Sequence, residues 1–307
     1  MEEKIEIMNL LQSKQTLTKE LNDLIYGSVE IREKDSNKYI YVHYREDGIL
    51  LTKYVGEYSD NLYNLILNNS IKAKELIKKI EKRLKQLNYI DEKLSPKVEI
   101  NIDFAKRHLV DTIYKQAILE GVATTFADTE SIIEGGKVNN MTSEDIMKIV
   151  NLKHAWEFIL NKNVILSDTN FPLLCEINKF VQEGFYYSAG KIRTVPVSIG
   201  GTKWTPEFPI ESIIKEELDD IFNKKISDID KAIEILLYIM KKQIFIDGNK
   251  RTSIIFANHY LISKGKGIIV IPAELTDEYK DLLINYYEGK DKTKIKRFLK
   301  EKCFMKI

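Results

Sequence analysis

The sequence has little of what marks a secreted, disulfide-rich or membrane-spanning chain. Only two cysteines, Cys175 and Cys303, occur among its 307 residues, and both stand in apolar contexts. Sparse, widely separated cysteines indicate a reducing compartment and buried thiols. No stretch approaches the roughly 18 apolar residues of a spanning helix, and the N-terminus shows no apolar signal-like segment. We therefore expect a cytoplasmic protein that does not enter a membrane.

The chain also lacks an excess of charge of either sign. Its 47 Lys and Arg residues offset 46 Asp and Glu residues, so no overall field attracts nucleic acid. The basic run from Lys72 to Lys85 contains Glu75 and Glu81 at helical spacing. This interleaving favours a solvated helix face over a nucleic-acid surface. Any anion site must therefore be local, and nucleic acid is not the expected partner.

The length and a change of pattern near Ser95-Pro96 predict two domains. Residues 1–95 are expected to form a small α+β domain, and residues 96–307 a mainly helical one. In the first domain, apolar spacing and alternation predict a helix over 5–24, strands over 28–54 with a hairpin turn at Asp47-Gly48, and a long amphipathic helix over 59–88.

The second domain is predicted to be a succession of helices interrupted by a β-hairpin. Val195, Val197 and Ile199 alternate with other residues, Gly200-Gly201 supplies a turn, and residues 203–205 return. Helices are predicted over 103–120, 131–134, 143–162, 171–183, 210–222, 228–243, 250–264, 278–287 and 293–302.

The strongest chemical signal lies between the helices predicted at 228–243 and 250–264. Asp247-Gly248-Asn249 does not continue a helix, so a new helix begins near Asn249 or Lys250. Its unpaired backbone N–H groups, beside Lys250 and Arg251, form a site suited to phosphate oxygens. Asp247 is a candidate Mg²⁺ ligand, because Mg²⁺ is usually held by one or two carboxylates together with phosphates. By themselves, these residues also fit a capped helix–loop–helix with surface charges.

This loop resembles the signature of the Fic family (Fic/Doc, or Fido), His-x-Phe-x-Asp/Glu-Gly-Asn-Gly/Lys-Arg, at every defined position except the first. The resemblance extends over roughly residues 103–287. It implies a mainly α fold, with a Fic-type helical domain that carries an inserted β-hairpin flap. For the site, it implies that Asp247 binds Mg²⁺, that Phe245 anchors the loop in the core, and that the phosphates of ATP are held by Gly248, Asn249, Lys250 and Arg251.

Gln243 stands where the family keeps its catalytic histidine. That histidine accepts the proton of a target hydroxyl as the oxygen attacks a phosphate, which a neutral amide cannot do. The loss of a general base costs about 10²–10⁴-fold in rate. His259, two turns along the next helix, is a candidate substitute base. Glycine is commoner in the family at the position of Lys250. With lysine there, the loop resembles that of the Doc-like branch, in which phosphoryl rather than nucleotidyl transfer results.

A second resemblance concerns regulation. Residues 116–121 are similar to the family's inhibitory helix, Ser/Thr-x-x-x-Glu-Gly, with Gln116 at the Ser/Thr position. The similarity implies a regulatory Glu120 that faces the anion site, toward Arg251 or Lys250. Ile254 occupies the position of the arginine with which the family's glutamate pairs. Alternatively, Glu120 simply ends a helix at Gly121.

The predicted hairpin resembles the family's flap, which aligns a protein target as an added strand. The resemblance implies that Arg193, Gly200, Gly201 and Trp204 lie where the target docks. Trp204 could instead pack beneath the flap.

Three functions are therefore open. The first is a nucleotidyltransferase or phosphotransferase that moves AMP (AMPylation) or a phosphoryl group from ATP to a hydroxyl of a target protein. The second is a catalytically inactive, nucleotide-binding regulatory pseudoenzyme. The third is an interaction or DNA-binding module built by residues 28–88. The sequence leaves open the target, the nucleotide base and the oligomeric state, including a homo-oligomer.

Overall fold

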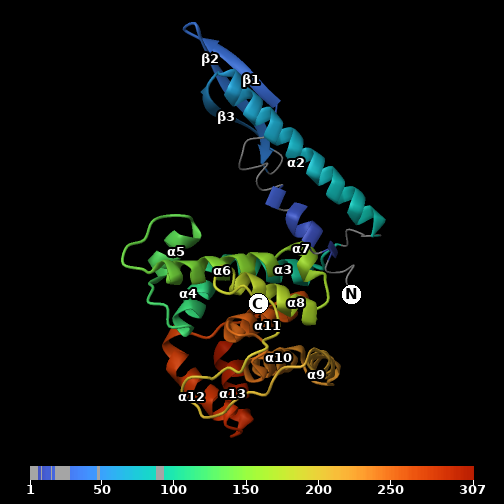
Figure 1. Ribbon diagram of the computed structural model, residues 1–307, viewed down its shortest axis with the longest axis vertical. Coiled ribbons are helices and arrows are strands. Elements are labelled where there is room, and N and C mark those ends of the chain that lie inside the picture. Colours follow the sequence, from blue (N-terminus) through green and yellow to red (C-terminus); the bar gives the residue numbers. More distant parts are fainter. Residues whose placement is uncertain (1–5, 8, 15, 18–27, 47–48, 88–92) are drawn as a thin grey trace. The chain divides into compact units, whose positions relative to one another are not determined.

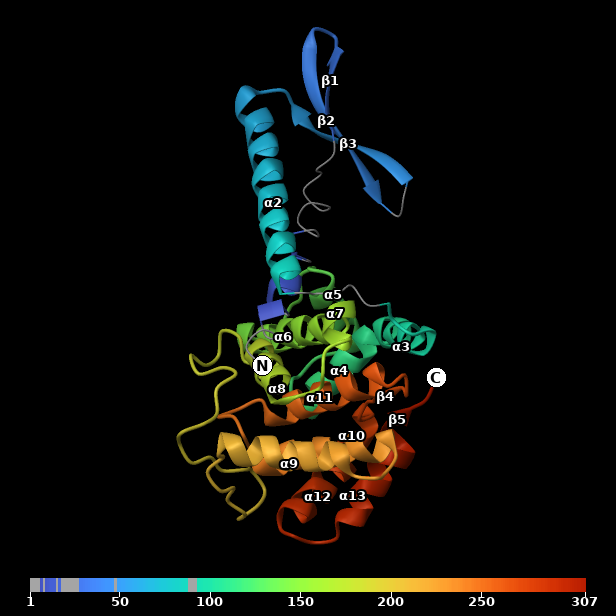
Figure 2. The same cartoon turned by 90° about the vertical axis from the view of Figure 1, so that its right-hand side faces the viewer.

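The chain forms two compact units, Met1–Asp91 and Glu92–Ile307 (Figures 1 and 2). No helix in the described part of the chain is long and apolar enough to cross a membrane. This computed structural model describes residues 6–7, 9–14, 16–17, 28–46, 49–87 and 93–307.

The first unit contains a three-stranded antiparallel sheet in the order β1-β2-β3, formed by β1 (Ser28–Lys34), β2 (Asn37–Glu46) and β3 (Ile49–Glu57). Asp35 and Ser36 join β1 to β2 with φ angles of 52° and 66°. A two-residue hairpin turn of type I′ has such positive φ values at both central residues. The predicted strands are thus confirmed, whereas the turn predicted at Asp47-Gly48 lies outside the described residues.

Helix α2 (Asp60–Gln86) follows the sheet, as predicted. The hydroxyl of Ser59 accepts a hydrogen bond from the backbone N–H of Leu62 at 3.1 Å and so caps the helix. Near its other end, Ile80 and Leu84 pack with Leu11 of the N-terminal segment. The helix predicted over 5–24 is helical at residues 6–7, 9–14 and 16–17, and its other positions lie outside the described residues.

In the second unit, α11 (Asn249–Ser263) lies at the centre, and almost all of its side chains are buried. Figures 1 and 2 show it between a layer that contains α6 and α8 and a layer that contains α9 and α10. The other helices of this unit are α3 (Pro96–Arg107), α4 (Leu109–Leu119), α5 (Phe126–Ile133), α6 (Ser143–Ile159), α7 (Lys162–Ile165), α8 (Phe171–Val181), α9 (Glu211–Asn223), α10 (Asp228–Lys242), α12 (Thr276–Tyr287) and α13 (Lys292–Phe298).

Some predicted helix boundaries are corrected by the structure. The helix expected from residue 103 begins at Pro96, where Ser95 provides the N-cap, and it breaks at His108 into α3 and α4. The last helix ends in a π-helical turn, η2 (Leu299–Cys303). A short antiparallel pair that the sequence pattern did not reveal, β4 (Ile268–Ile269) with β5 (Phe304–Met305), closes the unit.

The hairpin predicted around Gly200-Gly201 is not formed as paired strands. Residues 191–209 are all described and contain no strand, although the chain does turn at Gly200-Gly201. Pro196 and Pro206 lack the backbone N–H that a ladder needs, which interrupts pairing on both sides of the turn. We keep the word flap for residues 193–207, which form an irregular loop.

Candidate functional site

The loop between α10 and α11 is shaped by two residues with positive φ. Gln243 ends α10 in the left-handed region (φ 49°), and Gly248 precedes α11 at φ 74°. A Cβ atom at Gly248 would lie 2.4 Å from the Nε2 atom of Gln182, so a side chain does not fit there. The backbone of Gly248 therefore passes close to the end of α8. The first turn of α11 begins directly after it, and the N–H groups of that turn lie at the mouth of the loop.

Asn249 holds this loop together from inside. Its Oδ1 accepts the N–H of Phe245 at 3.0 Å, and its Nδ2 donates to the carbonyl of Phe245 at 2.8 Å. Phe245 itself is 1% exposed and packs in the core. The side chain of Asn249 is therefore used within the loop. For the predicted contact with phosphate, this residue has only its backbone N–H to offer.

The side chain of Gln243 is engaged at both ends of its amide. Nε2 donates to the carbonyl of Met240 at 2.6 Å, and Oε1 accepts from Nδ2 of Asn249 at 3.1 Å. The residue nevertheless borders the cavity described below. It can orient neighbouring groups, but an amide has no site that accepts a proton near neutral pH.

Four charged groups meet at the start of α11. Glu120 lies 3.3 Å from Nζ of Lys250 and 3.4 Å from Nε of Arg251, and Asp247 lies 3.3 Å from Nη2 of Arg251. Arg251 is only 2% exposed. Its Nε and Nη1 atoms have no hydrogen-bond partner among the described residues; Glu120 approaches Nε to 3.4 Å without hydrogen-bond geometry. Two buried cationic donors are thus held near an anion without being satisfied.

The position of Glu120 is fixed through α4. Gln116 donates from Nε2 to the carbonyl of Arg251 at 3.0 Å and accepts from Nε1 of Trp156 at the same distance. Gln116, where the resemblance leads one to expect Ser or Thr, therefore ties α4 to the first turn of α11. Gly121 follows with φ 79°. Both expectations for Glu120 hold together, since it ends a helix and also faces Lys250 and Arg251.

A cavity of about 410 Å³ is bordered by three of these charged residues, Glu120, Asp247 and Lys250, while Arg251 lies directly behind them in the same ion-pair cluster. One side is lined by Gln243, residues 247–250 and Glu120, and the flap contributes Ser198, Ile199 and Gly200. The opposite wall comes from one face of α12, which no motif in the sequence indicated. Only the i, i+3, i+4, i+7 spacing of that face could have suggested it: Lys280, Leu283, Ile284 and Tyr287.

The flap is held against α12 by packing. The ring of Trp204 stacks on that of Tyr287, with centroids 5.7 Å apart and planes at 12°. A Cβ at Gly201 would lie 2.9 Å from Cδ1 of Ile284, which shows how closely the turn approaches the helix. Of the two expectations for Trp204, packing beneath the flap describes its position. Gly200 is exposed, and a Cβ atom added at this position would have no other atom within 4 Å.

Arg193 was predicted to lie where a target docks, but the structure places its side chain in the interior, where it supports the flap. It is 2% exposed, so its guanidinium cannot meet an incoming chain. Its donors reach the carbonyls of Gln243 at 2.6 Å, Val195 at 2.8 Å and Pro206 at 3.3 Å. The side chain thus joins both ends of the flap to the residue that borders the cavity.

His259 is not placed to act as a substitute base. It is 0% exposed, its Nδ1 pairs with the hydroxyl of Thr169 and its Nε2 with the carbonyl of Val164, both at 2.8 Å. Burial lowers the pKa of this histidine to about 4. The ring links α11 to α7 and to the segment before α8, which is a structural role.

We expect His259 to make stability fall in acid. The unfolded chain binds a proton below its ordinary pKa of about 6.5, whereas the folded chain resists protonation down to about 4. The contribution is therefore complete above pH 6.5 and decreases by about 2 kcal/mol on going to pH 4.5. Urea unfolding at both pH values measures it. In His259→Gln this part of the pH dependence should disappear, and an unchanged dependence would contradict the assignment.

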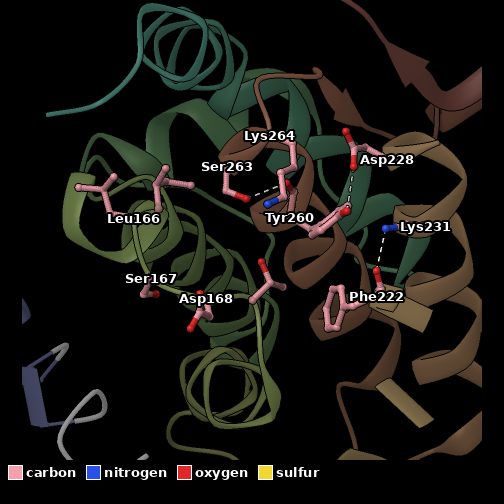
Figure 3. A pocket seen from close by; sticks show the side chains of 11 residues that line it. Leu166, Ser167, Asp168, Phe222, Asp228, Lys231, Tyr260, Ser263 and Lys264 are labelled. Carbon is pink, nitrogen blue, oxygen red and sulfur yellow. Dashed lines mark hydrogen bonds between the residues drawn. The ribbon is translucent and has the colours of Figure 1, made fainter. Parts of the chain in front are cut away.

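A second, larger cavity of about 540 Å³ lies at the opposite end of α11, beside Tyr260 and Lys264. Figure 3 shows two of its polar pairings, Tyr260 with Asp228 and Lys231 with the carbonyl of Phe222. No buried atom without a partner faces it among the described residues. The cavity at the N-terminal end of α11 is therefore the better candidate site.

The residues at the site fit a Mg²⁺ ion that is held mainly by a ligand. Asp247 is half-exposed and borders the cavity. No cluster of three or more His, Cys, Asp or Glu side chains suited to a metal occurs in the part of the chain that the structure describes. One carboxylate suffices when phosphate oxygens and water complete the shell, as is usual for Mg²⁺.

Comparison with known proteins places these elements in a family context. Residues 168–261, from the segment before α8 to near the end of α11, match the model of the Fic/DOC family. A curated relative, protein adenylyltransferase fic-1 of Caenorhabditis elegans, is 24% identical over 175 residues, which are 54% of this chain and 34% of the relative. The chain thus spans about a third of that relative's length. These matches support a Fic/Fido domain protein.

Solved structures show the same fold. Residues 134–508 of Fic-1 from C. elegans superpose with a TM-score of 0.54 at 18% identity, covering 78% of this chain and 74% of that one. A Fic domain containing signaling protein from Bacteroides thetaiotaomicron gives 0.52 at 18% identity, with coverages of 62% and 75%. A Fic family protein from Desulfovibrio desulfuricans G20 gives 0.51 at 13% identity, with coverages of 68% and 72%. The predicted mainly α, Fic-type fold is confirmed.

Proposed function

We propose that this protein binds ATP with Mg²⁺ in the cavity between loop 243–251 and α12, and transfers an adenylyl or phosphoryl group to a hydroxyl of another protein. The observation that carries the proposal is Arg251, a nearly fully buried guanidinium with two donors unsatisfied among the described residues. Buried donors of this kind favour an anionic ligand, since leaving them unpaired costs free energy. The matches to the Fic/DOC model and to an adenylyltransferase support the reaction class.

The charges and walls of the cavity suit a nucleoside polyphosphate. Phosphate oxygens would take the N–H groups of the first turn of α11 together with Lys250 and Arg251, replacing Glu120. Asp247 would contribute to the coordination of Mg²⁺, which neutralises phosphate charge. Leu283 and Ile284 offer an apolar surface for the nucleoside. The phosphates are therefore expected at the loop.

The chemical step would depend on positioning and charge stabilisation. The target hydroxyl attacks phosphorus, and pyrophosphate leaves in adenylyl transfer or ADP in phosphoryl transfer. Lys250, Arg251 and backbone N–H groups stabilise the developing charge on the phosphate oxygens. The hydroxyl proton passes to solvent, because Gln243 cannot accept it. Transfer is consequently expected to be slow.

A second candidate is a nucleotide-binding regulatory protein without transferase activity. The specific observation in its favour is Gln243, whose amide is occupied at both ends by Met240 and Asn249. In such a protein the phosphate site would remain and the chemistry would be absent. Both candidates predict binding, and only the first predicts transfer.

Titration calorimetry with ATP, ADP and GTP in Mg²⁺ tests the shared premise, and label transfer from ATP to lysate proteins separates the candidates. Binding of ATP with a micromolar dissociation constant would support the proposed site. Absence of binding for every nucleotide would overturn both candidates. Binding without label, under conditions in which a transferase control labels the lysate, would favour the second.

We also expect Glu120→Gln to bind ATP about 10-fold more tightly than the wild type. The carboxylate lies 3.3 Å from Lys250 and 3.4 Å from Arg251, so it competes directly with phosphate oxygens for both cations. The amide keeps the shape and removes the charge, and tenfold corresponds to about 1.4 kcal/mol.

A matched control for Glu120→Gln exists in the same chain. Glu134 also precedes a glycine and ends a helix, but it is exposed and lies outside the cavity. Glu134→Gln should leave ATP affinity unchanged. Equal affinities for Glu120→Gln and wild type would show that the carboxylate does not compete with the ligand.

A further inference from the structure

The cavity contains one cation without a matching carboxylate. Lys250 is paired with Glu120, and Arg251 is shared between Glu120 and Asp247. Lys280 borders the same cavity from α12, and it makes no ion pair or hydrogen bond within the described ranges. The two carboxylates are thus balanced by the loop cations, and Lys280 carries the remaining positive charge.

Position 254 cannot supply this charge. Ile254 is 2% exposed and turns toward a very small internal cavity lined by Thr112, Gln116 and Leu119. Its side chain therefore packs between α11 and α4. Any cation beyond Lys250 and Arg251 must come from another element, and α12 is the one that borders the cavity with a lysine.

The flap contacts the C-terminal half of α12, away from Lys280. Gly201 approaches Ile284, Thr202 hydrogen-bonds Glu288 at 3.3 Å, and Trp204 stacks on Tyr287. Lys280 lies one turn before Leu283 and Ile284 on the same face, about 10 Å along the helix from Tyr287. These three contacts of the flap all lie C-terminal to Lys280 along the chain.

We infer that Lys280 binds the terminal phosphate of the nucleotide and makes the site selective for triphosphates. The inference rests on the proposed function and specifies its ligand. A lysine carries a compact charge on a flexible stem, so it can follow a phosphate group that extends past the loop. No carboxylate of the described residues pairs with this lysine, so no local ion pair has to be broken before it binds an anion. Nucleoside monophosphates, which lack that group, gain nothing from it.

The test compares Lys280→Met with wild type by calorimetry, using ATP, ADP and AMP with Mg²⁺ in excess. Methionine keeps the length and apolar stem, and Lys280 is only half-buried, so folding should persist, as circular dichroism can verify. We expect ATP affinity to fall about 10-fold and AMP affinity to change less than about 2-fold. Lys280→Arg should retain most of the preference for ATP.

Lys225→Met serves as the control, because Lys225 is exposed, outside both cavities and without an ion pair among the described residues. It should match the wild type. If Lys280→Met keeps the full ratio of ATP to AMP affinity while Arg251→Ala weakens both ligands, the inference is overturned and the proposed function stands. If wild type binds none of the three nucleotides, the inference and the proposed function both fail.

Discussion

Arg251→Ala is expected to weaken ATP binding by about 100-fold, or roughly 3 kcal/mol. The guanidinium is 2% exposed and its Nε and Nη1 atoms lack hydrogen-bond partners in the described structure, so a phosphate that reaches them gains nearly unscreened contacts. Alanine also leaves Glu120 beside Lys250 alone, which strengthens that competing pair. Calorimetry with ATP and Mg²⁺ measures the loss.

The variant is informative because its backbone contacts survive. Gln116 bonds the carbonyl of residue 251, which alanine retains, so α4 and the start of α11 should stay together. Arg297→Ala removes an exposed arginine of α13 outside the cavity and should bind ATP like wild type. Equal affinities for Arg251→Ala and Arg297→Ala would mean that the buried arginine does not hold phosphate.

Much of the second unit could be predicted from apolar spacing and capping residues. Helices α8 to α12 lie close to their predicted ranges, because Asn170, Ser227 and Gly248 start helices by local rules that the sequence displays. The loop after α10 was predictable for the same reason, since Asp-Gly-Asn interrupts a helix by local chemistry.

Features that depend on contacts distant in sequence could not be read in advance. Arg193 looked like an exposed flap residue, but its donors are used by carbonyls up to fifty positions away, including that of Gln243. The flap failed to pair as strands because Pro196 and Pro206 outweigh the alternation of its valines. The α12 wall carries no motif, so only folding brings Lys280 to the cavity that the loop also borders.

Glu120 is an intermediate case. Its position relative to Gly121 was visible in the sequence, and so was the absence of an arginine at Ile254. The pairing with Lys250 and Arg251 instead follows from the tether between Gln116 and the carbonyl of Arg251, which no local pattern encodes. Sequence therefore identified the group, and tertiary contacts determine which cations it meets.

Gln243→His is expected to raise the rate of transfer to protein by about 10²–10⁴-fold, the usual contribution of a general base. The backbone at residue 243 has φ 49°, a region that histidine tolerates better than most residues. The amide now donates from Nε2 to the carbonyl of Met240. An imidazole that takes over this bond through one N–H keeps its second nitrogen bare, so it can accept a hydroxyl proton.

Label transfer from ATP to lysate proteins, measured across pH 5.5–8 (at least about one unit either side of the pKa of an unperturbed histidine), tests this. The Gln243→His rate should rise with pH through about 6.5, because only the neutral ring is a base. Gln243→Asn keeps an amide and should show neither the gain nor the pH dependence, while ATP affinity stays similar in all three proteins. Equal rates for wild type and Gln243→His would mean that proton removal does not limit the reaction. If neither variant nor wild type transfers label although all bind ATP, the site lacks more than a base, and that result would favour the regulatory function.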